Sequence, residues 1–252
     1  MRKFILKDRK TTILSKAVII FIWILLSKLV DNEIILPTVK STFISLISII
    51  KAPSFLNIIK CSLLRSLIGF LISLFLAIIM GVLSSISKLI YNLMVPILNF
   101  LNSVPTMAII ILALIWLNNE FVPMFVGFIM VFPILYETVL NAILNVDKNI
   151  MDMAKLYKVG KFTTIKDIYM PCIFSNLGLV LTSALGVNLK MVIAGEALAQ
   201  PKYAIGSNLQ LQKIYLNTSG VFAWIVIILL IGKIFKYGTK GVKYVFSLGK
   251  WK

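Results

Sequence analysis

The chain has 252 residues, 60% of them hydrophobic, and a formal net charge of +17. An apolar fraction this large exceeds that of ordinary soluble domains and predicts an integral membrane protein. Strong positive charge is also typical of nucleic-acid-binding proteins, but in so apolar a chain we interpret it through membrane topology and expect no nucleic-acid partner. Cys61 and Cys172 lie far apart and the chain has no histidine, so we expect neither a structural disulfide nor a Cys/His metal site.

Six apolar stretches are candidates for membrane-spanning helices, which need roughly 20 residues to cross about 30 Å of hydrocarbon. They cover residues 17–30, 66–87, 89–119, 122–143, 168–189 and 214–232. The first is short, and Lys28 near its end can extend its ammonium group to the interface. The third contains Pro96 and Pro105 and is expected to kink or to begin as an interfacial helix. The predicted fold class is an all-α polytopic membrane protein with about six spans and with both termini on one side.

The lysines and arginines are unevenly distributed over the connections between these stretches. Eighteen lie in residues 1–16, at Lys88, in residues 146–170 and in residues 233–252, whereas five lie in the connections on the other side. Cytoplasmic loops of membrane proteins carry the excess of basic residues, so both termini and residues 146–170 are expected in the cytoplasm of a bacterial cell. The basic arm before residues 17–30 resembles a signal peptide, but no small-residue cleavage pattern follows it, so we expect an uncleaved first span.

The predicted organisation is a membrane core with short flanks. Its parts are a cytoplasmic basic arm (1–16), a first span (17–30), an outer interfacial segment (31–62), a core of five helices (63–236) and a cytoplasmic basic tail (237–252). In the interfacial segment, apolar residues recur at helical spacing and a proline follows them: Phe43, Leu46, Ile47, Ile50 and Pro53. This pattern predicts an amphipathic helix along the outer interface.

Residues 147–171 interrupt the apolar runs with lysines and aspartates. Their apolar residues follow the i, i+3, i+4, i+7 spacing of an amphipathic helix twice, on either side of Gly160. The two sets are Ile150, Met153, Ala154 and Tyr157, and Phe162, Ile165, Ile168 and Tyr169. Two short helices around a turn, closed by Pro171, are therefore expected. Such a pair, with an apolar stripe and a basic rim, can lie on anionic lipid or dock in a groove of a partner protein.

The same segment resembles the EAA loop of ABC importer permeases. The family pattern is an acidic residue, an alanine two positions later, a glycine in the turn, and two apolar residues before a proline. Asp152, Ala154 and the end "IYMP" match this pattern. The family glycine, counted back from Pro171, falls on Lys158, and the glycine of this segment is displaced to Gly160. A lysine costs more than a glycine in a left-handed turn.

Further stretches resemble the nitrate/sulfonate/taurine branch of these permeases, in the order of that branch. They are "ILPTVKSTFISL", "SLLRSLIGF", "LNSVPTMAIIILALIWL", "FPILYETVLNAI" and "AGEALAQPKYAIGSNL", and together they cover roughly residues 34–235. The resemblance implies a type I ABC importer permease. Its solute would be a sulfonate-, nitrate- or taurine-like anion or a compound like a vitamin precursor.

The resemblance also implies partners. ABC ATPase subunits would hydrolyse ATP, an extracytoplasmic solute-binding protein would deliver the solute, and a second permease subunit would complete the pathway, by default as a homodimer. This chain would be a transport subunit in the membrane lipid rather than an enzyme, and would bind no cofactor directly. The residues implied in ATPase coupling are Asp152, Met153, Ala154, Tyr157, Lys158, Gly160, Ile165, Ile168 and Pro171.

Polar residues within the apolar runs are candidates for the translocation pathway, because such residues usually face the protein interior or water. Lys190 and Glu196 are six residues apart, so on a straight helix they point about 240° away from each other. Because Glu196 precedes Pro201, we expect the fifth span to break near Gly195, as helices in transporters often do at the binding site. Lys190 and Glu196 could pair only if the chain unwinds there; a structural ion pair or interfacial exposure is the alternative. Pro105 could expose carbonyl groups in the third span. Arg65, at the outer end of the second span, is expected to extend to the interface.

A secondary transporter or channel without an ATPase remains the alternative function. Proteins of those classes more often show paired internal repeats or a row of charged residues along the spans. We find neither in this sequence.

Overall fold

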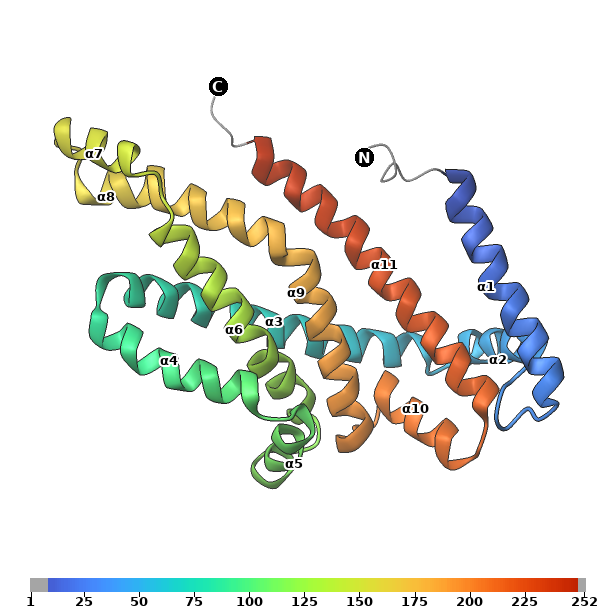
Figure 1. The fold of residues 1–252 in the computed structure, drawn as a ribbon. Coiled ribbons are helices and arrows are strands. Elements are labelled where there is room, and N and C mark those ends of the chain that lie inside the picture. The colour runs from blue at the N-terminus through green and yellow to red at the C-terminus, as the bar shows by residue number, and fades with distance from the viewer. Residues whose placement is uncertain (1–8, 249–252) are drawn as a thin grey trace. The chain divides into compact units, whose positions relative to one another are not determined.

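The computed structural model describes the backbone of residues 9–248, and the side chains of residues 14–238 except those of 16 and 161. The elements in this part of the chain are helices joined by short connections (Figure 1). The chain divides into two compact units, which we describe separately. One comprises Met1–Phe55 and Asn208–Leu229, and the other comprises Leu56–Ser207 and Leu230–Lys252.

The first unit contains α1 (Arg9–Val30), α2 (Val39–Lys51) and parts of α10 (Ile205–Ile214) and α11 (Thr218–Leu248). The Trp23 ring of α1 packs against Phe222 of α11 with 5.4 Å between ring centroids, and its Nε1 donates to the carbonyl of Pro37 at 3.0 Å. Thr38 caps α2 by accepting a hydrogen bond from the Ser41 backbone N–H. The helix predicted around Phe43 is therefore confirmed as α2.

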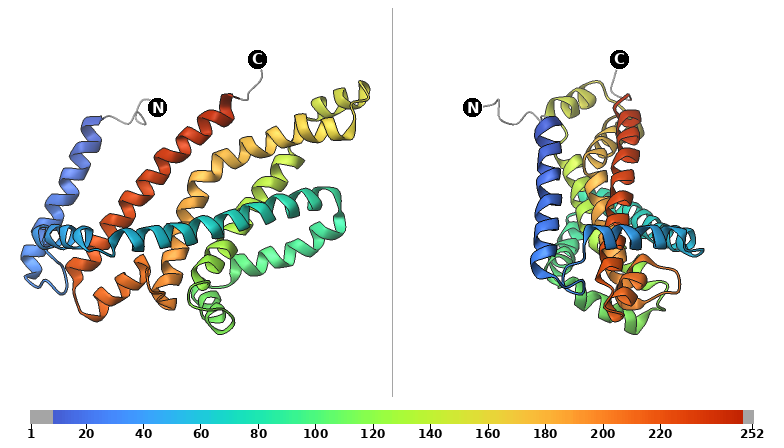
Figure 2. Two further views of the ribbon diagram at one scale, coloured as in Figure 1. Left: turned by 180° about the vertical axis from the view of Figure 1, so that it is seen from behind. Right: turned by 90° about the vertical axis from the view of Figure 1, so that its right-hand side faces the viewer.

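The second unit begins with α3 (Phe55–Ile86), whose first residue belongs to the other unit, and continues through the helices up to the start of α10. These are α4 (Lys88–Ser103), α5 (Thr106–Trp116), α6 (Val122–Leu144), α7 (Lys148–Leu156), α8 (Lys161–Thr164), the π-helix η2 (Ile165–Tyr169) and α9 (Met170–Ala199). The later part of α11 completes it. Figures 1 and 2 show α6 and α9 side by side, with α7 and α8 at the end of this pair. Buried side chains of α3, α4, α6 and α9 form its largest apolar core, including Phe70, Met94, Leu135 and Ile173.

Small residues bring α3, α6 and α9 into close contact. A Cβ atom on Gly69 of α3 would lie 2.7 Å from the Met124 carbonyl oxygen of α6, and one on Gly127 of α6 would lie 2.5 Å from Asn188 Oδ1 of α9. Asn188 Nδ2 in turn donates to the backbone and hydroxyl oxygens of Ser66, at 2.6 and 2.8 Å. Small residues and interhelical hydrogen bonds of this kind are the usual means of joining helices in membranes.

Four helices of the described part are long and apolar enough to cross a membrane, and α4 with α5 makes a fifth span if that bent pair is counted as one. This agrees with an all-α polytopic membrane fold. The apolar part of α1, Ala17–Val30, is shorter. The whole of α1, with 22 residues, is about 33 Å long at 1.5 Å per residue.

The stretch 89–119, which was expected to kink or to begin as an interfacial helix, forms two helices with a bend of 104° between α4 and α5. Pro105 occupies the N-cap position of α5. Other expectations are corrected. The predicted break near Gly195 is wrong, because α9 continues to Ala199. The expected boundary between residues 62 and 63 falls inside the continuous α3. Of the expected basic arm and tail, residues 1–8 and 249–252 lie outside the described residues.

Candidate functional site

The segment 147–171 folds as a helical hairpin. Asp147 begins α7 by accepting a hydrogen bond from the Asn149 N–H at 2.9 Å, as side chains at helix N-caps commonly do. At the other end, Lys158 N–H donates to the Lys155 carbonyl at 3.0 Å and Val159 N–H to the Ala154 carbonyl at 2.9 Å. This pair of bonds is the Schellman arrangement that closes many helices.

The position that holds glycine in the family pattern is the left-handed residue of this turn. Lys158 has a φ of 50°, whereas Gly160 is not among the residues with positive φ. The turn expected around Gly160 is therefore present, but Lys158 provides the left-handed conformation.

The second arm of the hairpin, which we call the return helix, consists of α8 and η2. It continues into α9 through the single π-helical turn of η2. Met170 N–H donates to the Ile165 carbonyl, five residues back, and Pro171 follows immediately. In a regular α-helix the proline ring would meet the carbonyl of residue i−4, here Asp167. The π-helical turn of η2, which is wider than an α-helical turn, lies just before Pro171, at the place where this steric clash would occur. On its other side, the return helix lines a small cavity of about 150 Å³ with the ends of α3 and α6, through Ile165 and Tyr169.

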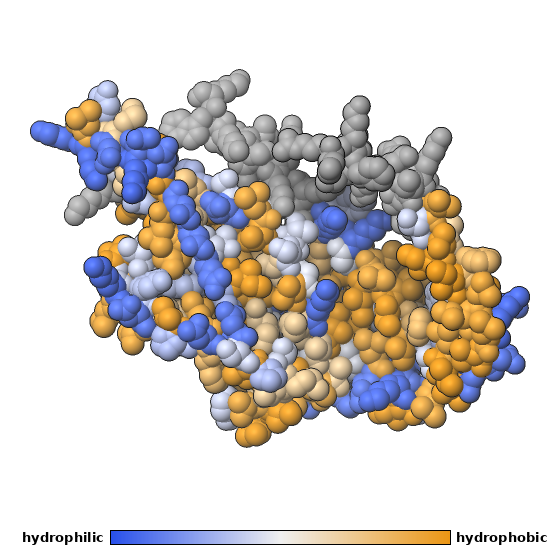
Figure 3. Space-filling model, viewed as in Figure 1, coloured by the Kyte–Doolittle hydropathy of each residue, from blue (hydrophilic) through white to orange (hydrophobic). Residues whose placement is uncertain are grey.

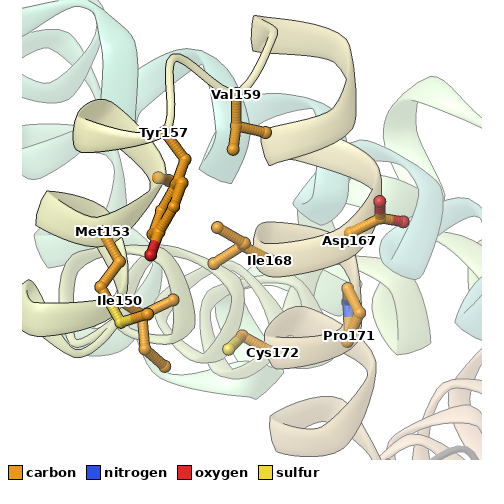
Figure 4. Close-up of a pocket in the computed structure, with 9 residues that line it drawn as sticks. Ile150, Met153, Tyr157, Val159, Asp167, Ile168, Pro171 and Cys172 are labelled. Atoms are coloured by element: carbon orange, nitrogen blue, oxygen red, sulfur yellow. The ribbon is translucent and has the colours of Figure 1, made fainter.

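The two arms of the hairpin enclose an apolar groove of about 580 Å³ (Figure 4). Its lining residues are Ile150, Met153, Ala154, Tyr157, Val159, Asp167, Ile168, Pro171 and Cys172. Figure 4 shows Met153 and Tyr157 facing Ile168 across this space. Of the residues expected in ATPase coupling, Met153, Ala154, Tyr157, Ile168 and Pro171 lie in the groove, while Asp152, Lys158, Gly160 and Ile165 do not line it. Val159, Asp167 and Cys172 were not predicted.

The hairpin exposes large apolar side chains beside charged ones. Met153, Leu156, Tyr157 and Phe162 are all more than half exposed, whereas Ala154 is buried. Figure 3 shows hydrophobic and hydrophilic residues adjacent to each other at the α7 end. Asp152 forms an exposed ion pair with Lys155 at 3.2 Å, which contributes little to stability. Exposed apolar groups gathered on a polar element mark a binding surface.

A second polar cluster lies within the helices. Glu196 of α9 is completely buried, and its carboxylate accepts hydrogen bonds from Arg65 Nη1 at 3.0 Å, Ser62 Oγ at 2.9 Å and the Gly206 N–H at 3.1 Å. The Ser62 hydroxyl also accepts from the Ile205 N–H at 3.0 Å. The carboxylate and this hydroxyl thus cap the N-terminus of α10, where negative charge is favoured.

Arg65 is the centre of this cluster, which we call the Arg65 cluster: Ser62, Arg65, Glu120, Glu196 and the turn 203–206. Besides Glu196, Arg65 donates to the Tyr203 carbonyl at 2.8 Å and pairs with Glu120 between α5 and α6. The expectation that Arg65 extends to the interface is therefore wrong, because its side chain is buried between two carboxylates. Glu196 does form a structural ion pair, as the alternative reading expected, but its partner is Arg65 and not Lys190.

The three predicted pathway residues do not share one environment. Glu196 is buried and fully engaged in the Arg65 cluster, whereas Lys190 and Pro105 are exposed. The pairing of Arg65 with Glu196 spans 131 positions in the chain, beyond the reach of local periodicity. The signal that could have found it is the presence of one cation and one anion within separate apolar runs, because charges in a membrane tend to pair.

The sequence of this chain is similar to those of known transport proteins. Residues 73–239 match the family described as "Binding-protein-dependent transport system inner membrane component". A relative named "Putative aliphatic sulfonates transport permease protein SsuC", from Bacillus subtilis (strain 168), is 25% identical over 225 residues, which cover 88% of this chain and 81% of the relative. The matched family region begins within α3 and includes the hairpin and α9.

Proposed function

Because this chain belongs to the family of binding-protein-dependent transport system inner membrane components, we propose that it is the permease subunit of an ATP-driven importer for a small organic anion. Members of this family are transport subunits rather than enzymes, and this chain is a multi-pass membrane permease. The finer proposal concerns coupling. The hairpin 147–171 docks on a cytoplasmic ATPase subunit and transmits the movement of that subunit to the membrane helices.

The groove of the hairpin is the observation that carries this proposal. Its walls are apolar, and exposed Met153, Tyr157 and Phe162 flank it. Apolar surface of this kind gains free energy when a partner covers it. The distribution of basic residues supports a cytoplasmic position for the hairpin, on the side of the membrane where an ATPase subunit would act.

The attachment of the hairpin suits it to transmit movement. Its first arm follows α6 after a short connection, and its second arm continues into α9. Ile165 and Tyr169 also line the small cavity together with residues at the ends of α3 and α6. A displacement of the hairpin therefore moves α6 and α9 together, as in rigid-body switching between two states.

The proposed assembly contains two permease subunits, by default two copies of this chain, two ATPase subunits that hydrolyse ATP, and an external solute-binding protein. The solute class follows the name of the relative, which refers to aliphatic sulfonates. We therefore propose a sulfonate-like anion as the solute, in preference to a compound like a vitamin precursor.

The test is co-purification of the chain in mild detergent, with the Ala154→Asp variant beside the wild type. Ala154 is buried in the groove, and an unpaired carboxylate in a desolvated contact costs about 3 to 5 kcal/mol. We expect the variant to insert into the membrane but to bind the ATPase subunit roughly 100- to 4,000-fold more weakly, and uptake to fall to background. Asn149→Asp is the matched control, because it adds the same charge to an exposed position of α7 outside the groove.

Two outcomes count against the proposal. Uptake that survives Ala154→Asp contradicts the coupling role of the groove. Purification of the wild-type chain without an ATPase subunit under several conditions contradicts the importer itself and favours a secondary transporter or channel.

A further inference from the structure

Helix α9 exposes three polar side chains, which we call the polar stripe, on the face opposite its packed side, where Leu179 is also exposed. Its residues packed toward α3 and α6 include Leu177, Ala184, Asn188 and Val192, all of them buried. At about 100° per residue, Asn176, Ser183 and Lys190 lie within about 40° of one another on the opposite face. All three are exposed.

Lys190 differs from the other two members of this stripe. Asn176 donates to the Cys172 carbonyl at 2.9 Å and Ser183 to the Val180 carbonyl at 2.8 Å, so each is satisfied by its own helix. Lys190 takes part in none of the ion pairs among the described residues. Glu196, the acidic residue of α9, is already bound by Arg65.

The space around Lys190 on this face is open. Gly186 lies one turn before Lys190, and a Cβ atom on it would meet nothing within 4 Å. Asn188 contacts Gly127 within α6, so Lys190 lies at a depth inside the span rather than beyond its end. Its Cα–Cβ bond leans toward the N-terminus of α9, which is the hairpin end, and hence away from the outer interface.

Two other long apolar helices of the chain expose mostly hydrophobic side chains. The exposed residues of α11 include Ile225, Leu229 and Ile234, and those of α3 include Leu67, Leu71 and Phe75. These surfaces are apolar, as contact with lipid requires. An ammonium group exposed to lipid inside the membrane costs free energy, so charged side chains in membrane helices usually face protein or water instead.

We propose that Lys190 lines the translocation pathway and binds the anionic group of the solute. The inference rests on the proposed function and adds the residue and the contact. An ammonium group offers three donors to the oxygen atoms of a sulfonate or a similar anion. A single point charge holds such an anion less rigidly than the two-pronged guanidinium of arginine, which suits a site that must also release its solute.

The first test is chemical and does not depend on transport. In a chain with Cys61→Ser and Cys172→Ser, the Lys190→Cys variant is treated in membranes with the water-soluble reagent 2-sulfonatoethyl methanethiosulfonate. Leu229→Cys on the apolar face of α11 is the matched control. Because the thiolate is the reactive form and is disfavoured in hydrocarbon, we expect the Lys190→Cys thiol to react at least about tenfold faster. Equal rates at the two positions overturn the inference.

The second test measures uptake of butanesulfonate into proteoliposomes that contain the complete complex. Loss of a charged hydrogen bond corresponds to roughly 10- to 100-fold in affinity, and we expect Lys190→Met to lower the uptake rate at low butanesulfonate concentration by this factor. Lys190→Arg keeps the charge and is expected to retain most of the rate. Lys213→Met removes an exposed lysine of α10 and is expected to behave as wild type. All three variants should keep the ATPase subunit.

The two tests separate failure of this inference from failure of the proposed function. If the Lys190→Met variant takes up butanesulfonate as fast as the wild type, the role of Lys190 is overturned and the proposed function is unaffected. Absence of butanesulfonate uptake by the wild type contradicts the proposed solute class, and the labelling rates then still decide whether position 190 faces water.

Discussion

Lys158 adopts a left-handed conformation that an L-residue reaches only at a cost of roughly 1 to 2 kcal/mol. The turn keeps its two closing hydrogen bonds to Lys155 and Ala154 despite this cost. We therefore expect Lys158→Gly to stabilise the hairpin by about 1 kcal/mol, since glycine enters this region without strain. Amide hydrogen exchange of α7 measures the effect, and protection should rise about fivefold.

Gly160→Ala serves as the control for this prediction. Gly160 does not have a positive φ, and a Cβ atom on it would meet only Thr163 Oγ1, at 4.0 Å. Exchange in α7 should therefore stay close to wild type. Faster exchange after Lys158→Gly would show that the turn does not store this strain.

Single residues also show where sequence reasoning succeeded and where it did not. Helical spacing predicted that Ala154, Met153 and Tyr157 share one face of a helix, and in the structure all three line the groove; their role in coupling stays a prediction. The contribution of Cys172 and Asp167 was not predictable, because the groove closes only when the second arm returns through the π-helical turn. The environment of Arg65 was missed because its partners come from distant segments.

At the scale of elements, the Arg65 cluster joins α3 to α9, to the start of α10 and to the connection before α6. Arg65→Met removes the cation and leaves the buried Glu196 carboxylate without its counter-charge. Breaking a buried pair in this way typically costs about 3 to 5 kcal/mol. We expect a clear fall in the thermal unfolding midpoint of the purified chain in detergent.

Glu120→Gln is the comparison for this variant. Glu120 is half exposed, and its substitution leaves the bond between Arg65 and Glu196 in place. Its unfolding midpoint should stay close to that of the wild type. If Arg65→Met unfolds no earlier than Glu120→Gln, the buried pair does not stabilise the junction of these helices.

The helices themselves were largely predictable, because long apolar runs and the amphipathic pattern of α2 are local signals. A kink or an interfacial start was expected in 89–119, but the size of the 104° bend before α5 was not predictable, because a proline permits a kink or a helix start and packing decides between them. The continuation of α9 to Ala199 was not predicted either. The break expected near Gly195 was inferred from Pro201, whereas the helix continues almost to that proline.

At the scale of the whole molecule, the prediction concerns the two sides of the membrane. The distribution of the basic residues predicts that both termini lie in the cytoplasm, and this prediction requires α1 to cross the membrane. A fluorescent protein fused after Lys252 should fluoresce, and alkaline phosphatase fused there should be inactive, with the same result for fusions before Met1. Alkaline phosphatase inserted after Lys51, in the outer connection, should be active.

This experiment tests α1 directly. If α1 lies on the surface, the number of spans becomes odd and the two termini report opposite sides. The composition predicted a membrane protein and its overall class, which the family match supports. The crossing of α1 depends on a balance between a short apolar part and a basic first turn, and neither composition nor helix length decides it.

The long separation between Arg65 and Glu196 has a consequence for biosynthesis. The ribosome must add 131 residues after Arg65 before Glu196 exists, which takes roughly 7 to 26 s at about 5 to 20 residues per second. Arg65 thus enters the membrane ahead of its buried counter-ion. An arginine at a helix centre opposes insertion by about 2.5 to 3.5 kcal/mol, and Arg65, in the first half of α3, opposes it by at most this amount. The apolar residues of α3 must offset that cost. Glu120, 55 residues on, is made first, so the guanidinium has an earlier partner while the later helices are still being synthesised.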